Sequence, residues 1–419
     1  MASNTNIIAN KRGSVSSHFH FHLHLHLRLH LLLFSLFFVA KFDLVSGLNY
    51  TKYSRKVSSL RLERIQKHLE KINKPAVLTI VSPDGDIIDC VHKKKQPALD
   101  HPLLKNHKIQ RVAPEMPKVK MLKREEEKID SKRNEGEDFV WQMWHRNGTR
   151  CPKGTVPIRR STTRDVLRAK SLFHFGKKQP TIIDPTSRRA DAPDVVSGGG
   201  HEHAIAYTGT SQEVYGAKAT INVWDPAIQE VNEFSLSQIW VLSGSFDGSD
   251  LNSIEAGWQS GFVQTNSRIA IGAAISPVSQ YAANQYDITI LIWKDPKLGN
   301  WWMGFGDNNL VGYWPAELFT HLTDHATMVE WGGEVVNSRA NGKHTSTEMG
   351  SGHFAEDGFG KASYFRNLEI VDGDNSLSSV HDISILAENT NCYNIKNSYN
   401  NEWGTYFYYG GPGNNPRCP

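Results

Sequence analysis

This chain of 419 residues has few long apolar runs and few cysteines, and clusters of basic residues are scarce in its second half. The longest apolar run, Leu31 to Ala40, is ten residues interrupted by Ser35, which is too short to span a bilayer as a helix. None of the four cysteines stands in a CxxC pair, which disfavours zinc and dithiol redox motifs. Few lysines or arginines cluster beyond His201, so no nucleic-acid partner is expected.

Familiar catalytic signatures are also missing. The sequence contains no GxSxG elbow, no HExxH helix motif and no kinase signature, and no cysteine has the flanks of a catalytic nucleophile. His201 and His203 would face the same way on a strand, but no third ligand lies nearby in the sequence, so we expect no metal and no cofactor. Residues 306–309 (GDNN) have ordinary turn chemistry.

The N-terminus has the pattern of a targeting segment. Lys11 and Arg12 precede the apolar run, and cleavage after Gly47 would end a signal peptide and leader at residues 1–47. The histidine-rich stretch 18–30 is interpreted as part of this leader, with metal binding as the alternative. An uncleaved signal anchor is the alternative to cleavage. If the leader is removed, we expect that no stable membrane span remains. We then expect the protein to be secreted and to lie in the extracellular space, the apoplast or the vacuole.

Glycosylation motifs and cysteine spacing agree with export. Asn49 and Asn147 each begin an Asn-x-Thr motif that is modified on the secretory route. Four cysteines allow three pairings, and Cys90–Cys151 with Cys392–Cys418 is favoured because each bridge then closes a loop within one domain. Four unpaired thiols would be unusual in an oxidising compartment.

The first part of the chain predicts a small α+β pro-domain. Leu62, Ile65, Leu69 and Ile72 have helical spacing, and residues 77–81 and 87–91 predict two strands joined by a Ser-Pro-Asp-Gly turn. Residues 115–138 are dense in charge and predict an exposed linker or lid. The expected boundaries are a pro-domain at 48–178, an exposed, cleavable linker at 179–200 and a mature domain at 201–419.

The mature domain predicts an all-β fold. Short strands alternate with Gly, Pro, Asn and Asp, and no helical pattern long enough for a parallel crossover separates them, which favours an antiparallel β-sandwich or barrel. The predicted strands are 203–208, 219–224, 234–243, 254–259, 269–274, 288–293, 328–336, 362–370 and 405–409.

Two glutamates stand out by their surroundings. In residues 252–259, apolar and polar positions alternate as on a strand. Ile254 would face the core, and Glu255 would lie on the opposite, polar face, which carries no lysine or arginine. In residues 330–336, Glu334 shares a face with Gly332, and a strand glycine lets another backbone approach closely. A carboxylate beside such a glycine suits a groove for an extended peptide. The alternative is that both are ordinary solvated strand glutamates.

These residues carry a dense resemblance to the neprosin family of plant proteins. It covers nearly everything after residue 58. The matching motifs are QPALDHPLLKNH at 96–107, CPKGTVPIRR at 151–160, YGAKA at 215–219, FSLSQIW at 234–240, IEAGWQ at 254–259, GFVQTN at 261–266, VGYWP at 311–315, WGGE at 331–334, MGSGHF at 349–354 and YYGGPG at 408–413.

The resemblance implies an N-terminal activation peptide and a secreted, zymogen-type glutamic endopeptidase that cuts after proline at acid pH. It places the two catalytic carboxylates at Glu255 and Glu334, because the IEAGWQ and WGGE motifs are intact. Such a pair would share a proton, activate water and donate to the leaving group. Gln238, in FSLSQIW, is the candidate for holding the oxyanion, with a cross-strand hydrogen bond as its alternative role. The partners implied are a peptide or protein substrate and the chain's own pro-domain as inhibitor.

One departure from the family pattern bears on activity. The family carries roughly thirty further residues after Gln259, including a strand and a local cysteine pair, whereas here Ser260 runs straight into Gly261. This departure keeps a second hypothesis open, namely an inactive extracellular β-sandwich that binds a peptide or a cell-wall polymer. Peptide cleavage at acid pH that is abolished by Glu255→Gln separates the two.

Overall fold

The computed structural model describes residues 58–119, 141–145, 148–169, 172, 175, 200–209, 213–245, 250–255, 261–306, 309–339 and 342–419. The chain divides into two compact units, residues 1–64 and 65–419. The described elements belong to the second unit, except for the first turns of the helix at Ser59–Ile72, which crosses the boundary. Both predicted glycosylation sites, the leader with its cleavage site, and residues 179–199 of the predicted linker lie outside the described residues. Among the described residues, no helix is both long and apolar enough to cross a membrane.

An N-terminal module, described between residues 65 and 169, is built on a small antiparallel sheet. Its sheet order is β1 (Ala76–Val81), β2 (Ile87–His92) and β5 (Thr155–Arg159). Helix α2 (Ser59–Ile72) and the short helix α3 (Thr163–Arg168) pack through Ile65, Leu69 and Val166. The predicted helix and strand pair are confirmed.

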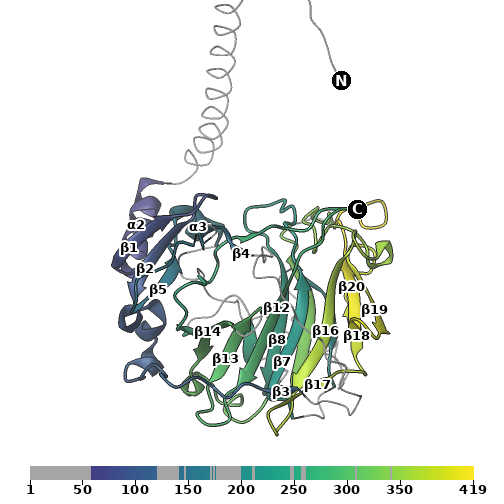
Figure 1. The fold of residues 1–419 in the computed structure, drawn as a ribbon. Coiled ribbons are helices and arrows are strands. Elements are labelled where there is room, and N and C mark those ends of the chain that lie inside the picture. The colour runs from purple at the N-terminus through teal and green to yellow at the C-terminus, as the bar shows by residue number, and fades with distance from the viewer. Residues whose placement is uncertain are drawn as a thin grey trace, which may run out of the picture. The chain divides into compact units, whose positions relative to one another are not determined.

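Most of the remaining strands form a sandwich of two large sheets (Figure 1). The five-stranded sheet has the order β18 (Ser384–Ala387), β6 (His201–Tyr207), β15 (Met328–Val336), β8 (Ser235–Ser243) and β9 (Asn252–Glu255). The ten-stranded sheet runs β10 (Val263–Gln264), β14 (Asn309–Trp314), β13 (Trp301–Phe305), β12 (Asp287–Lys294), β7 (Gly216–Asn222), β16 (Ser363–Val371), β17 (Ser376–Ser379) and β3 (Lys118–Val119), with β20 (Gly404–Gly410) paired to β16 and β19 (Asn394–Asn400).

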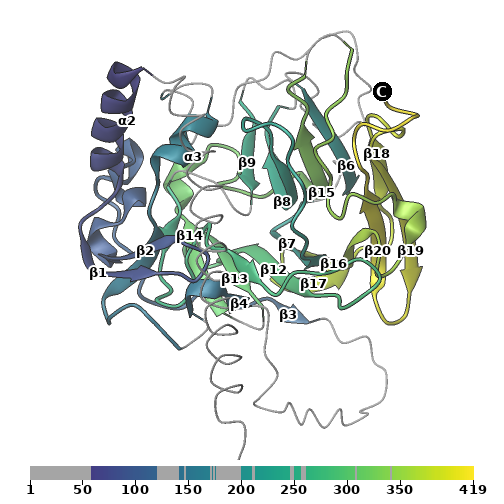
Figure 2. The same cartoon turned by 90° about the horizontal axis from the view of Figure 1, so that it is seen from above.

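Alternating side chains fill the space between these sheets. Trp331 and Ile239 point inward from the five-stranded sheet, and Ile292, Phe365 and Phe407 do so from the other. Figure 2, seen from above, separates the layer of β9, β8, β15 and β6 from the layer of β13, β12, β7 and β16. Named strands pair antiparallel except for β17 with β3. The predicted antiparallel sandwich, preceded by a small α+β part, is therefore confirmed.

The predicted strand at 269–274 is wrong, and a glutamine explains why. The side chain of Gln142, from β4 (Trp141–Gln142), donates to the Ala270 carbonyl at 2.5 Å and accepts from the Ala270 amide at 2.7 Å. These bonds replace a strand ladder, and Gly272 turns the chain with a φ of 79°. The chain then forms β11 (Ile275–Ser276), which pairs with β4. The antiparallel pairing of β13 with β14 was not predicted, and the turn predicted for residues 306–309 lies partly outside the described residues.

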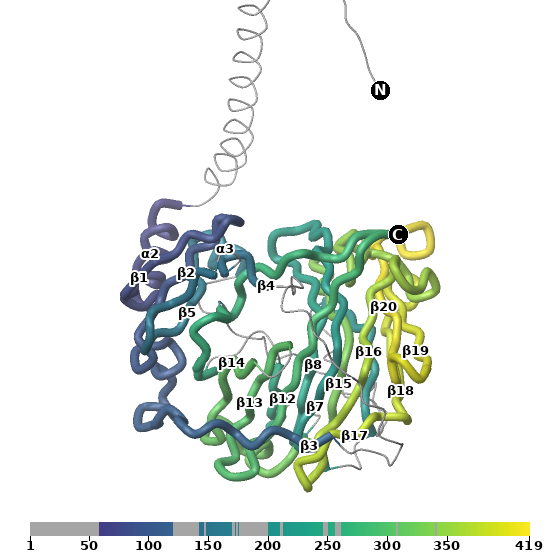
Figure 3. The backbone as a smooth tube through the Cα atoms, in the orientation of Figure 1, coloured from purple at the N-terminus to yellow at the C-terminus, as the bar shows by residue number. Residues whose placement is uncertain are grey.

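Residues 93–119 form a strap that runs along the outer face of the ten-stranded sheet (Figure 3). Ala98 and Leu104 are buried against Trp293, Trp302 and Tyr313. Gln96 accepts from the Gln264 amide at 2.7 Å, and its own amide donates to the Gln264 carbonyl at 3.2 Å. The strap ends in β3, whose side chains are exposed as predicted, whereas residues 115–117 at the start of the predicted exposed linker are half-buried against the sandwich. Residues 120–138 lie outside the description.

Both predicted disulfides are present in the structure. Cys90–Cys151 joins β2 to the start of the segment leading into β5, with 5.4 Å between α-carbons. Cys392–Cys418 ties the C-terminus to the turn before β19, also with 5.4 Å between α-carbons. Each bridge stays within its own part of the chain, because the first lies in the N-terminal module and the second in the sandwich.

Candidate active site

The outer face of the five-stranded sheet carries several buried carboxyl, imidazole and amide groups. On β15, Val329, Trp331 and Val335 face the core, so Glu330 and Glu334 point to the opposite side. Strand periodicity puts their cross-strand neighbours on that same side. The polar members of this face are nevertheless buried: Glu330, Glu334, His203 and Gln238 expose 4%, 2%, 6% and 5% of their surface.

Glu334 lies against two histidines of the neighbouring strand β6. His201 Nδ1 is 2.5 Å from Glu334 Oε1, and His203 Nε2 is 3.6 Å from the same oxygen. On its other side, His203 Nδ1 lies 3.0 Å from Oε2 of Glu388, which also accepts the His203 backbone amide at 2.8 Å. His203 thus stands between two carboxylates in a buried row.

This arrangement determines the charge of His203. Burial lowers the pKa of its imidazole, but the hydrogen bonds and charges of Glu334 and Glu388 outweigh burial and raise the pKa to about 10. The ring is therefore an imidazolium throughout the acid and neutral range. A buried positive charge beside Glu334 stabilises the ionised form of that carboxylate.

Glu255, the other candidate carboxylate, has neutral hydrogen-bond donors around it. Ser253 Oγ donates to Oε1 at 3.0 Å, and Gln238 Nε2 donates to Oε2 at 3.0 Å. Glu255 is the last residue of β9, which is the outermost strand of this sheet among the described residues. The structure therefore gives Gln238 a cross-strand bond, and that bond goes to a candidate catalytic group.

The strand register separates Glu255 from Glu334. Glu255 stands opposite Trp240, which stands opposite Glu330, while Glu334 lies four residues further along β15. Given about 3.3 Å per residue and about 4.8 Å between strands, the two α-carbons are roughly 13 Å apart along the strands and roughly 10 Å across them. Gln238, opposite Gly332, occupies the middle of this diagonal.

Two further features of the structure bear on the choice of site. A cavity of about 380 Å³ is bordered by residues 235–239 of β8, including Gln238, and is otherwise lined largely by apolar residues such as Ile221, Ile290 and Phe305. Its apolar lining does not suit a pair of catalytic carboxylates.

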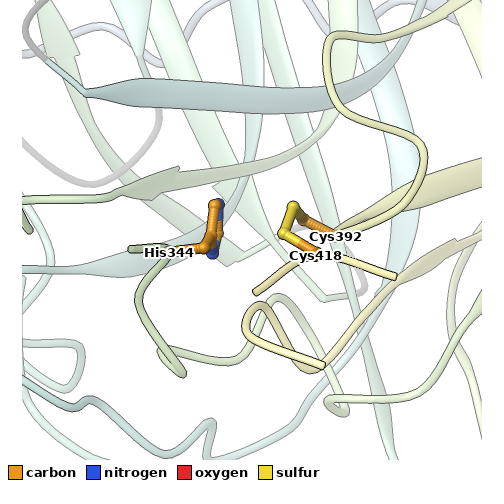
Figure 4. Close-up of side chains that lie close together, drawn as sticks. All are labelled: His344, Cys392 and Cys418. Carbon is orange, nitrogen blue, oxygen red and sulfur yellow. A yellow bond between two sulfur atoms is a disulfide. The ribbon is translucent and has the colours of Figure 1, made fainter. Parts of the chain in front are cut away.

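The second feature is a close approach of His344 to the Cys392–Cys418 disulfide (Figure 4). Their ligand-type atoms lie within 4.8 Å of one another, but the two sulfur atoms are bonded to each other and offer no thiolate. His344 instead bonds Glu202 at 2.8 Å. Burial lowers the pKa of His344, but the hydrogen bonds to Glu202 and to the Thr345 carbonyl, together with the charges of Glu202 and Glu233, raise it by more, so the net direction is upward.

Two stretches of the chain match models of known protein families. Residues 259–412 match the model described as Neprosin, and residues 79–207 match the Neprosin activation peptide. The chain belongs to the neprosin family. Because it carries an activation peptide, it is of the zymogen type within this peptidase family.

The residues of the candidate site fall in different parts of these two matches. Glu334 and Glu388 fall within the Neprosin match, whereas β6 with His201 and His203 falls at the end of the activation-peptide match. Gln238 and Glu255 lie between the matches. The alternation of His201 and His203 on one strand placed the two rings on one face, but it indicated only possible metal ligands. No pattern in the sequence pointed to Glu388.

Proposed function

We propose that this neprosin is a glutamic endopeptidase that hydrolyses peptide bonds after proline at acid pH, with Glu255 and Glu334 as its catalytic carboxylates. The observation that carries this proposal is the diagonal Glu334–Gln238–Glu255 on one sheet face, with unlike surroundings for the two acids. Paired acids of unlike environment are how enzymes separate the general base from the general acid.

The surroundings assign a role to each acid. Glu334, beside the imidazolium of His203, stays ionised and takes a proton from the attacking water. Glu255, whose two oxygens accept from the Ser253 hydroxyl and the Gln238 amide, is assigned as the general acid that donates a proton to the departing amine.

The row between the acids is the place that we assign to the substrate. Gly332 contributes no side chain to the row it shares with Gln238, and we propose that an extended peptide binds across the sheet at this row. As the carbonyl becomes tetrahedral, the Gln238 amide, which has two N–H groups, can keep one on Glu255 and offer the other to the oxyanion.

The activation peptide regulates this enzyme before processing. Its described strap lies on the ten-stranded sheet, which is the opposite layer from Glu255 and Glu334. We propose cleavage between residues 170 and 200, directly before the strand that carries His201 and His203. Loss of the pro-segment on acidification, seen by gel and N-terminal sequencing, tests this point.

The decisive assay maps cleaved bonds by mass spectrometry after incubating the secreted protein with a mixed peptide library at pH 3.5. Enrichment of proline on the amino side of cleaved bonds is expected. Cleavage without that enrichment would contradict the proline preference but would still support peptidase activity.

A catalytically silent binding protein is the second candidate. It is favoured by a Neprosin match that begins only at Gln259, after Glu255. A folded, fully processed protein that cuts no peptide in the library would establish this candidate instead.

A further inference from the structure

A cluster of aromatic side chains lies on the outer face of the ten-stranded sheet. Strand alternation sends Phe365, Phe407 and Tyr409 into the core, and so turns Tyr364 and Tyr408 outward. Three further rings join these two: Tyr406, Trp403 and Phe359. Centroid distances within the cluster run from 4.7 Å for Tyr364–Trp403 to 6.4 Å for Tyr364–Tyr408.

The cluster is accessible and rests on a rigid base. Phe359 exposes 59% of its surface, and Trp403, Tyr406 and Tyr408 are partly exposed. Tyr364 is buried beneath them, and its hydroxyl donates to Asp287 at 2.9 Å. A contiguous exposed aromatic patch with an ordered floor marks a binding surface, because single exposed rings are common and grouped ones are not.

Several rings of the cluster meet edge to face. The interplanar angle is 79° for Trp403–Tyr406, 80° for Tyr406–Tyr408 and 71° for Phe359–Trp403, whereas Tyr364–Trp403 and Phe359–Tyr364 are tilted by 38° and 35°. A flat saccharide platform would need ring faces that share one plane. These rings touch one another and present an uneven surface of faces and edges, on which pyrrolidine rings can pack as they do in aromatic grooves that bind polyproline II segments.

The same sheet face already holds a proline-bearing segment of this chain. In the strap, Pro114 is buried, and Pro117 follows three residues later in a stretch without helix or strand. The indole of Trp293 donates to the carbonyl of Glu115, between these prolines, at 3.0 Å. The Asn375 side-chain amide donates to the same carbonyl at 3.3 Å. Aromatic faces and donors to the carbonyls are the two parts of polyproline recognition.

We propose that the aromatic cluster Phe359–Tyr364–Trp403–Tyr406–Tyr408 is an exosite that binds extended, proline-rich polypeptide, separate from the sheet that carries Glu255 and Glu334. It continues the face on which the strap is docked. The exosite deepens the proposed function, because it would retain proline-rich substrates near an enzyme that cuts after proline. Its occupant is a polypeptide in the polyproline II form, which loses little conformational entropy on binding.

Binding is measured with the full, processed protein carrying Glu334→Gln, so that no probe is cut. Fluorescence anisotropy with a labelled twelve-residue oligoproline is expected to show saturable binding, weakened at least tenfold by Trp403→Ala with Tyr406→Ala. Phe359→Ser, at a ring that is mostly exposed, should weaken binding several-fold without changing the melting temperature. Tyr399→Ala is the matched control, because Tyr399 exposes 55% and contacts His381 instead of the cluster.

Two outcomes would overturn the exosite. Affinity for oligoproline that is unchanged in the Phe359 and Trp403–Tyr406 variants would exclude the cluster as the binding surface. If the parent protein binds cellohexaose but not oligoproline, and these variants abolish the cellohexaose binding, the cluster is a saccharide site. Either result stands whether or not the parent protein cleaves peptides, so failure of the exosite is distinguishable from failure of the peptidase proposal.

Discussion

Gln238 and Glu255 are joined by a hydrogen bond of 3.0 Å between Nε2 and Oε2, which links the adjacent strands β8 and β9. This bond is the direct contact between two of the three residues that we assign to catalysis. Its consequence is that an uncharged amide donor helps to orient the carboxyl group that we assign as the general acid. Glu334, two strands away, is oriented by imidazole groups instead.

Replacing Gln238 by leucine removes that donor while keeping a similar volume. We expect kcat on a proline-containing peptide to fall by about 10²–10³, with little change in KM, because a donor that serves the transition state has been lost. Gln280→Leu, at an exposed glutamine of a distant turn, is the control. Unchanged kcat with a lower melting temperature would leave Gln238 a purely structural cross-strand bond.

His203 makes stability depend on pH in a predictable direction. The folded-state pKa, about 10, lies above the ordinary value of 6.5, so the stabilisation is complete below about pH 6.5 and is lost as pH rises towards 10. Thermal melts of the parent protein should therefore fall steadily in midpoint between pH 6 and pH 10.

The variant His203→Gln isolates this contribution. It should melt lower at pH 5 and show a shallower decline above neutrality, with the remaining slope due partly to His344. His321→Gln changes a half-exposed histidine paired with Asp250 and should leave the slope unaltered. An equal slope in parent and His203→Gln would show that the imidazolium between Glu334 and Glu388 is not the cause.

Gln96 fastens the activation-peptide strap to the sandwich. It exposes 1% of its surface and exchanges two hydrogen bonds with the backbone of Gln264. Gln96→Ala leaves those buried groups unpaired, which weakens docking by about 1–3 kcal/mol. After processing at acid pH, more of the pro-segment should separate from the sandwich on size exclusion than in the parent or in the exposed-site control Lys94→Ala. Equal co-elution would contradict this role.

The spacing of turn residues predicted much of this fold, because Gly, Pro, Asn and Asp mark where the strands end. Strands β8, β15 and β16 follow the predicted ranges within two residues at either end. Strand β19 was missed because its residues are mostly polar and exposed, so it carries little periodic signal. The segment at 269–274 was mistaken for a strand because its apolar residues are buried, while the side chain of Gln142, far away in sequence, takes its backbone bonds.

The site was predictable in composition but not in arrangement. Period two put Glu255 on a polar face and Glu334 on the face of Gly332, as the structure has them. Strand order, which places β8 and hence Gln238 between the two glutamates, depends on long-range pairing that no local pattern encodes. The contact of His203 with Glu388 spans 185 residues and depends on the β6–β18 pairing in the same way.

The most direct test compares cleavage of a proline-containing peptide at about pH 3.5 by the processed parent, Glu255→Gln, Glu334→Gln and Glu369→Gln. Glu369 pairs with Lys218 on the other sheet and serves as the matched control. The account predicts cleavage after proline by the parent and the Glu369 variant, with kcat lowered by at least about 10³ in each of the other two. Full activity in a folded Glu255→Gln or Glu334→Gln protein would contradict it.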